Sequence, residues 1–401
     1  MKEQPIIYLD HNATTPVDPA VVEAMLPFFT EHFGNPSSLS HSLGWQAEAA
    51  VEKARETLAL VLNAEPTEII FTSGATESNN LAIKGVAESY MADGKHIITV
   101  ETEHSAVLAP CRYLERLGFS VTYLPVQTDG LIDLAELERA FRPDTILVSV
   151  MTANNEIGVL QPIAEIGQLC RDFSKKRLRD RNIIFHTDAA QALGKVPLDV
   201  QAMNIDLLSM TAHKLYGPKG IGALYVRRKN PRVQLAPQMH GGGQERGVRS
   251  GTLYTPQIVG FGVAVEKAIE QQSREMERQK GLRDRLWKHI QTLPGIHLNG
   301  HPTQRLANNL NISIEGINST DLLSRLRHEV ALSSGSACSS TQTSPSHVIK
   351  ALGRSDELAK ATLRFGLGKE TTAEEIDRAR TVVFETVKSL RTSSLTRGRS
   401  L

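Results

Sequence analysis

Short runs of apolar and β-branched residues alternate with longer stretches of helical periodicity between about residues 45 and 290. Seven runs predict strands, at residues 68–72, 96–100, 121–124, 145–151, 183–187, 207–211 and 223–226. Several of these runs are almost wholly apolar, which is typical of sheets covered on both faces. The stretches 45–62, 77–93, 105–117 and 163–173 predict helices. The alternation favours an α/β fold with a mostly parallel sheet of seven strands.

The pattern changes after a long predicted helix at residues 265–293, in which Leu282, Leu286 and Ile290 recur on one face. Further on, residues 308–314 and 362–365 predict strands, and residues 321–327, 347–352 and 373–390 predict helices. Thr371 and Glu374 are spaced for a capping box at the start of the last helix. We therefore expect a large domain over residues 16–262 and a small α+β domain over residues 1–15 and 263–401.

Composition narrows the class of protein. Of the 401 residues, 40% are hydrophobic and 22% are charged, which excludes a disordered chain, a collagen and a disulfide scaffold. Lys and Arg total 45 and Asp and Glu total 44, so no charge excess indicates binding to nucleic acid or to a membrane surface. No apolar run resembles a secretory signal or approaches the roughly 20 residues of a membrane helix. The three cysteines are scattered and form no CxxC metal or redox pair, so we expect a protein of the reducing cytoplasm.

Candidate chemistry follows the predicted strands, at the edge where open α/β sheets bind ligands. Lys214, in the sequence TAHKLYGPKG, is either a Schiff-base lysine or a surface lysine before a turn. The turn Ser73-Gly74-Ala75-Thr76 is either a phosphate cradle at a helix N-terminus or an ordinary strand–helix connection. It is not a Walker loop, since no GK[ST] follows.

Four further side chains leave two interpretations open. Asp188 either holds a protonated ring nitrogen, with Gln191 near a phenolic oxygen, or caps a helix. His104 either stacks on a flat cofactor and moves protons or is structural. Asn155, in NNEIG, either binds a substrate carboxylate or shapes a turn.

Cys338 lies in the segment SSGSACSS, among small residues rather than apolar ones. A thiol in such a loop, at about residues 333–345, is accessible and can reach a substrate, which favours a reactive role. Cys111 and Cys170 lie within predicted helices and are expected to be inert.

Together these candidates supply a phosphate cradle, a ring-nitrogen partner, a stacking group and an imine lysine, which are the parts of a site for pyridoxal 5'-phosphate (PLP). The chain resembles the cysteine desulfurases, PLP enzymes of aminotransferase class V, and within them the iron–sulfur-cluster and nitrogen-fixation type. The motifs that carry the resemblance are YLDHNATTPVDP, FGNPSS, SGATES, TEH, NNEIG, HTDAAQ, HKLYGPKG, GGGQERGVRSGT, SSGSAC and LRFGLGKETTAEEID. The resemblance spans nearly the whole chain and implies the PLP-dependent transferase fold type I.

The resemblance also implies roles, residue by residue. Lys214 would carry the cofactor covalently, with Asp188 at the pyridine nitrogen, Gln191 at the ring oxygen and His104 stacked on the ring. The cofactor phosphate would be bound by Thr76, Thr211 and His213, and by Thr252 of the partner subunit in a homodimer, and Ala75 would also bind the cofactor. Asn155 and Arg364 would hold the substrate carboxylate, and Cys338 would accept the sulfur of L-cysteine as a persulfide. No metal is expected.

The sulfur would then pass to an acceptor protein for iron–sulfur cluster assembly, tRNA thiolation or both. Three other functions stay open: a selenocysteine lyase or broader C–S lyase on the same cofactor, a PLP aminotransferase of the same fold that needs no Cys338, and a catalytically inactive binding or regulatory protein.

Overall fold

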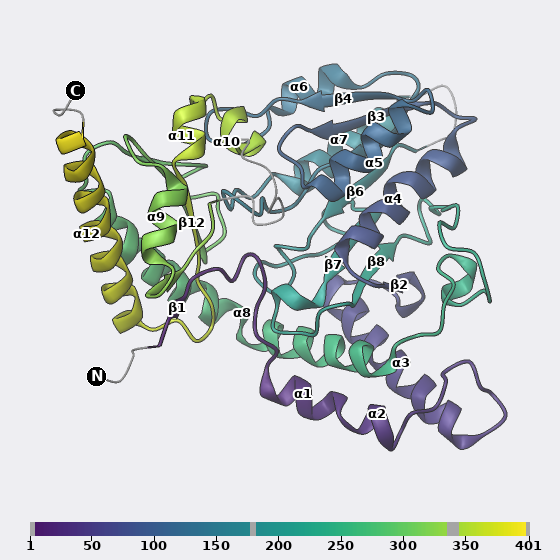
Figure 1. The fold of residues 1–401 in the computed structure, drawn as a ribbon. Helices are drawn as coiled ribbons and strands as arrows, with labels where there is room; N and C mark the ends of the chain where they lie inside the picture. Colours follow the sequence, from purple (N-terminus) through teal and green to yellow (C-terminus); the bar gives the residue numbers. More distant parts are fainter. Residues whose placement is uncertain (1–4, 177–181, 335–344, 398–401) are drawn as a thin grey trace.

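The computed structural model describes residues 5–176, 182–334 and 345–397, with side chains up to residue 392. A seven-stranded sheet is the centre of the larger part of the molecule (Figure 1). Its strands, in spatial order, are β2 (Ile69–Thr72), β8 (Gly222–Val226), β7 (Leu207–Thr211), β6 (Ile184–Asp188), β5 (Thr145–Ser149), β3 (His96–Val100) and β4 (Ser120–Leu124). Strand β8 runs antiparallel to both of its neighbours, and the other pairs are parallel. The predicted mostly parallel sheet and all seven predicted strands are confirmed.

Helices cover both faces of this sheet, which explains why most of its strands are buried along their whole length. Leu81 of α4 (Ala75–Tyr90) and Val107 of α5 (Ser105–Glu115) pack in one apolar layer. The opposite layer takes side chains from α3 (Ser42–Leu62), α6 (Leu134–Ala140), α7 (Ile163–Lys175) and the start of α8 (Thr255–Ile290). Two short helices, α1 (Pro19–Met25) and α2 (Pro27–Thr30), precede α3. The result is a helix–sheet–helix sandwich.

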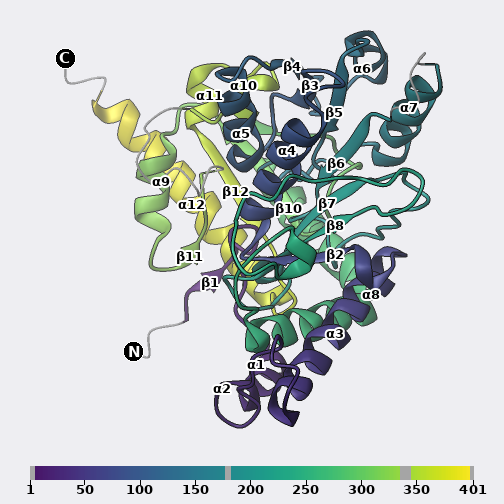
Figure 2. The same cartoon turned by 90° about the vertical axis from the view of Figure 1, so that its right-hand side faces the viewer.

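The smaller part of the molecule has its own apolar core around an antiparallel sheet of β12 (Thr362–Gly366), β10 (Asn309–Ile314) and β9 (Ile296–Leu298). Strand β1 (Ile7–Tyr8) pairs in parallel with β11 (Val330–Ala331) beside it. The helices here are α9 (Ser319–Leu326), α10 (His347–Ala351), α11 (Asp356–Lys360) and α12 (Ala373–Arg397), and Figure 2 shows α9 and α12 on the same side as β1 and β11. Among the helices described, none combines the length and apolar composition that crossing a membrane requires.

Helix α8 joins the two cores. Its first turns place Ile258 and Phe261 in the core of the large sheet, and its last turns place Leu286 and Ile290 in the second core. It begins at Thr255, ten residues before the predicted start at Val265. Pro256 stands in its first turn, where proline is well tolerated and does not interrupt the helix. The helix therefore crosses the predicted division between residues 262 and 263 without a break, and the division itself stays a prediction.

Two local predictions need correction. The capping box at the start of α12 forms one residue later than expected: the Glu375 carboxylate accepts from the Thr372 N–H, and the Thr372 hydroxyl accepts from the Glu375 N–H. The hydroxyl of Thr371 instead accepts from the N–H of Gly368 at 2.9 Å. Asp188 is the last residue of β6 rather than the first residue after it.

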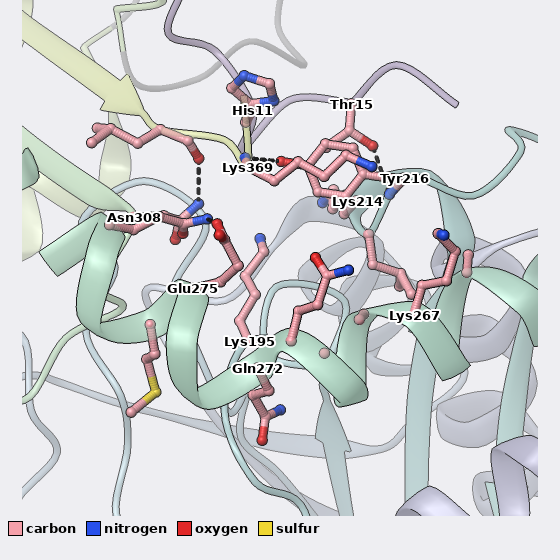
Figure 3. A pocket seen from close by; sticks show the side chains of 18 of the residues that line it. His11, Thr15, Lys195, Lys214, Tyr216, Lys267, Gln272, Glu275, Asn308 and Lys369 are labelled. Carbon is pink, nitrogen blue, oxygen red and sulfur yellow. Dashed lines mark hydrogen bonds between the residues drawn. The ribbon is translucent and has the colours of Figure 1, made fainter. Parts of the chain in front are cut away.

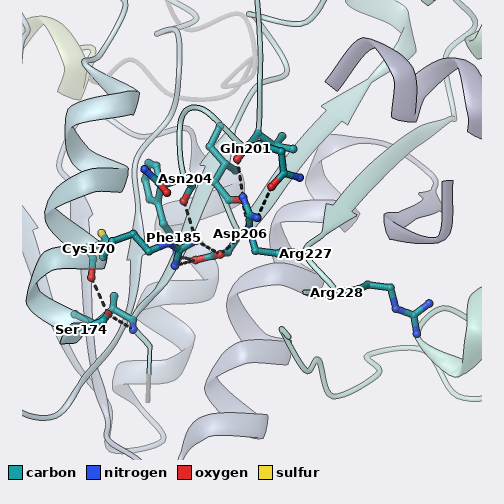
Figure 4. A network of polar contacts seen from close by, with 12 residues as sticks. Cys170, Ser174, Phe185, Gln201, Asn204, Asp206, Arg227 and Arg228 are labelled. Atoms are coloured by element: carbon teal, nitrogen blue, oxygen red, sulfur yellow. Dashed lines mark hydrogen bonds and ion pairs between the residues drawn. The ribbon is translucent and has the colours of Figure 1, made fainter. Parts of the chain in front are cut away.

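A buried ion-pair network fixes the amino ends of β6 and β7 (Figure 4). The fully buried carboxylate of Asp206 accepts from Arg171 on α7, with 3.0 Å to its Nη1, and lies 3.1 Å from Nε of Arg227. It also accepts from the backbone N–H of Phe185 at 2.9 Å. The Asp206 side chain thus joins α7 to β6 and β7 at the amino ends of these strands. The candidate site residues lie at the opposite, carboxyl ends of the same strands.

We expect Asp206→Ala to lower the free energy of unfolding by about 3–5 kcal/mol, because the buried Arg227 and the partly buried Arg171 lose their shared carboxylate partner. Denaturant unfolding of the full chain measures this change. Glu136→Ala is the control, since the Glu136–Arg139 pair is solvent-exposed and such pairs contribute little. Equal losses in the two variants would contradict the role given to Asp206.

Candidate active site

A cleft of about 740 Å³ opens at the carboxyl ends of the parallel strands and is closed on one side by residues of the smaller part. Ten of the predicted site residues line it: Ala75, Thr76, His104, Asn155, Asp188, Gln191, Thr211, His213, Lys214 and Arg364. They come from separate strand ends, so the topology of the sheet brings them together, as expected for open α/β folds.

One end of the cleft is the turn between β2 and α4. Gly74 caps the helix with φ +150°, a conformation that side chains rarely adopt. A Cβ on Gly222 would lie 2.6 Å from the Gly74 Cα, so two glycines let these backbones approach. The first turn of a helix carries N–H groups without intrahelical acceptors, and the hydroxyls of Thr76 and Thr211 line the same end. This donor set suits a phosphate.

Asp188 and Gln191 lie deeper in the cleft, and both are buried. The Asp188 carboxylate accepts from the Asn79 amide at 2.7 Å and from the Ala190 N–H at 2.9 Å. The Gln191 amide donates to the carbonyl oxygen of Asn12 at 2.8 Å, and its oxygen accepts from Lys195 at 3.1 Å. Both side chains are therefore held in place by the protein itself.

Lys214 ends the short 3₁₀ turn η2 (Ala212–Lys214), which follows β7 directly. Beside it, burial and then repulsion by Lys214 lower the pKa of His213 to about 4, so this ring is neutral near pH 7. The ring of His104 caps α5, its Nδ1 accepting from the Ala106 N–H at 3.1 Å. Burial is also the main cause that lowers the pKa of His104, which leaves a neutral, flat ring facing the cleft.

Arg364 reaches the cleft from β12 and is almost completely buried. Its guanidinium donates to Asp10 at 2.8 Å and to the carbonyl oxygen of Asn155 at 3.0 Å. The N-terminal segment and the NNEIG turn thus aim one cation into the cleft. The Asn155 side chain lines the same wall.

One predicted site residue that the structure describes is not part of this arrangement. Thr252 is exposed and does not line the cleft of its own chain. Cys338 lies outside the described residues. The other two thiols lie in helices, as expected, and both are buried; burial raises the pKa of Cys111 to about 12 and also raises that of Cys170.

Further polar groups that were not predicted from the sequence line the cleft, among them Glu103, Glu156 and His347. Burial raises the pKa of both carboxyl groups, that of Glu103 strongly. The Ser346 hydroxyl donates to Glu156 at 2.6 Å, and the His347 ring lies 3.1 Å from the carbonyl oxygen of Glu103. Glu103 directly precedes His104 and Glu156 directly follows Asn155 in the chain. This adjacency to predicted site residues was the only feature of the sequence that could have indicated these two acids.

Comparison with known proteins shows the family to which the chain belongs. A family model described as "Aminotransferase class-V" matches residues 7–379. "Cysteine desulfurase IscS" of Dechloromonas aromatica (strain RCB) is 55% identical over 96% of this chain and 93% of its own length. The protein of the same name from Neisseria meningitidis serogroup C (strain FAM18) is 57% identical over the same shares of the two chains.

Solved structures give the same result. A "NIFS-LIKE PROTEIN" superposes with a TM-score of 0.88 and 38% identity, covering 96% of this chain and all of the other. "SspA in complex with cysteine" superposes with a TM-score of 0.77 and 42% identity, covering 90% of this chain and 98% of the other. This chain belongs to the class-V aminotransferase family and, within it, to the cysteine desulfurases.

Proposed function

We propose that this protein converts L-cysteine to L-alanine and transfers the sulfur to its own Cys338. The observation that carries the proposal is one cleft in which Lys214, a buried Asp188 and a buried Arg364 converge. A related protein was solved "in complex with cysteine", which supports the choice of substrate.

PLP is the cofactor of this family, and the residues present fit it. The buried Asp188 oxygens suit a protonated ring nitrogen, the glycine turn before α4 suits the phosphate, and Lys214 lines the same cleft. PLP supplies an electron sink that stabilises negative charge at the substrate Cα. Asp188 would keep the ring nitrogen protonated, and the neutral His104 would stack on the ring.

The chain's own groups divide the remaining work. Arg364 and Asn155 would hold the substrate carboxylate, and this fixes the Cα–H bond relative to Lys214. The Lys214 amine, once released, would take the Cα proton and return it within the cleft. Both arms of the Arg364 fork are already oriented by Asp10 and by the Asn155 carbonyl, so little ordering remains when the substrate binds.

Sulfur transfer needs a thiolate at the substrate sulfur. In our proposal the Cys338 thiolate attacks that sulfur, an S–S bond forms and the substrate C–S bond breaks. The carbon fragment takes up protons and leaves as alanine. The atoms balance without a further oxidant, since L-cysteine and one enzyme thiol give L-alanine and one enzyme persulfide.

Arg364→Lys keeps the charge but loses the fork that serves Asp10, Asn155 and the substrate together. We expect kcat/KM for L-cysteine to fall about 10- to 100-fold, mostly through KM. Steady-state alanine formation measures it, with Arg327→Lys on the exposed surface as control. A change of less than twofold would remove Arg364 from the substrate site.

A homodimer is part of the proposal. Thr252 is exposed on its own subunit, so it would complete the phosphate site of the partner subunit. Tyr254, two residues after Thr252, is a large apolar side chain that is exposed. The segment from α1 to the start of α3 exposes more of them, among them Leu26, Phe29, Phe33, Leu39 and Trp45. Exposed apolar surface of this kind favours a protein–protein interface.

The persulfide would pass to an acceptor protein, and the relatives named IscS favour iron–sulfur cluster assembly over the tRNA thiolation that also stays open. A cytoplasmic location completes the proposal, because the acceptor thiol has to stay reduced between turnovers.

Product analysis of the PLP-loaded protein tests this function. With L-cysteine and excess thiol reductant, we expect alanine and sulfide in equal amounts. Turnover of L-selenocysteine but not L-cysteine would favour a selenocysteine lyase. Amino transfer from L-alanine to a 2-oxo acid, with no sulfide from L-cysteine, would favour an aminotransferase.

A further inference from the structure

A second cavity, of about 80 Å³, lies behind Lys214, between the loops that follow β6 and β7 and the middle of α8 (Figure 3). It has room for only a few water molecules. Cofactor and substrate therefore belong to the larger cleft. Lys214 lines both cavities, and Lys195 enters the small cavity from the loop after β6.

The Lys195 amine is held in one place. It donates to the side-chain oxygen of Gln191 at 3.1 Å, and Gln191 is itself buried and bonded to the Asn12 carbonyl oxygen at 2.8 Å. Gln191 lines the large cleft, so the hydrogen bond between Lys195 and Gln191 links the small cavity to the cleft proposed to hold the cofactor.

The surroundings of Lys195 are basic. Burial, followed by repulsion from Lys214 on η2 and Arg364 on β12, lowers the pKa of Lys195 to about 7. Repulsion by Lys195 in turn contributes to the lowered pKa values of His11 and His213, after burial as the main cause.

The acids of the small cavity are already engaged. Asp18 pairs with Lys369 and Lys267, and Glu275 pairs with Arg278. Within residues 5–176, 182–334 and 345–397, no ion pair includes Lys195.

We propose that Lys195 is a positioning residue that acts through Lys214: its cation, fixed by Gln191, disfavours a proton on the Lys214 nitrogen. Repulsion between the Lys195 and Lys214 amines makes it unfavourable for both to be protonated. The pair therefore holds about one proton over a pH range in which two separate lysines would hold two. Lys214 has to be unprotonated to take the Cα proton, so Lys195 extends the activity toward lower pH, in the range near and below pH 7 where Lys195 is itself charged. This inference rests on the proposed function, because it takes Lys214 as the cofactor-bearing lysine.

Spectroscopic titration of the holoenzyme tests the inference without relying on turnover. The visible absorption of bound PLP changes when the Lys214 nitrogen takes up a proton. Lys195→Met removes the neighbouring cation, so we expect the midpoint to rise by about one pH unit or more. Lys195→Gln should raise it as well, and serves if the methionine variant does not fold.

Lys195→Arg stays charged and should keep the midpoint at or below the wild-type value. The acidic limb of kcat for alanine formation should move in parallel in each variant. Lys267→Met is the matched control, since Lys267 lines the same cavity but faces the carboxylate of Asp18 at 3.9 Å, and no shift is expected.

A midpoint in Lys195→Met within about 0.3 units of wild type would overturn the inference. An upward shift in Lys195→Arg equal to that in Lys195→Met would also overturn it, because the effect would then come from packing and not from charge. Wild-type protein that shows no visible PLP band would contradict the proposed function itself.

Discussion

Replacing Lys214 by alanine is expected to lower kcat for alanine formation from L-cysteine by at least about 10³-fold. In our account one nitrogen has two functions, since it attaches the cofactor and then carries the Cα proton. Proton transfer by a positioned group alone contributes about 10²- to 10⁴-fold. The nearby Lys195 does not replace it from the same position, because the Lys195 amine is bonded to Gln191 in the small cavity.

Single-turnover alanine formation and the visible spectrum measure this effect together. Lys229→Ala, at an exposed lysine on the surface, is the control and should behave as wild type. Activity of Lys214→Ala within tenfold of wild type would mean that another group moves the Cα proton.

Asp188→Asn is expected to leave PLP bound and to lower kcat about 10²- to 10³-fold, a loss typical of removing a preorganised electrostatic partner. The substitution keeps the size of the side chain, so the Asn79 and Ala190 contacts around it change little in shape. In our account it removes the negative charge that would hold a proton on the ring nitrogen, and the electron sink would weaken without that proton.

The PLP content of Asp188→Asn, determined from its absorbance, separates binding from chemistry in this test. Asp321→Asn, at an exposed aspartate on α9, controls for the change of charge. Normal PLP content with kcat within about threefold of wild type would remove Asp188 from the ring nitrogen.

The large sheet was readable from the sequence because its strands are covered on both faces and therefore appear as short apolar runs. Short elements with no such run were missed, among them β1, which is two residues long and exists only through its pairing with β11. Helix boundaries shifted for local reasons, as in α8, which starts at a proline-containing turn that carries little helical periodicity. Local pattern does not report pairing between distant segments.

The same distinction applies to the site. Lys214, Asp188 and His104 follow predicted strands, so the rule for the carboxyl ends of a parallel sheet brought them together in advance. The contact of Arg364 with Asp10 joins residues from opposite ends of the chain, and no spacing in the sequence reports it. The position of Lys195 behind Lys214 likewise required the packing of α8 against the loops of the sheet.

The most direct test of the central claim is to measure alanine and enzyme-bound persulfide formed from L-cysteine without reductant, in wild type and in Cys338→Ala. Our account predicts one persulfide and one alanine per wild-type active site, and loss of both in the variant while PLP stays bound. Alanine and persulfide at wild-type rates from Cys338→Ala would contradict it.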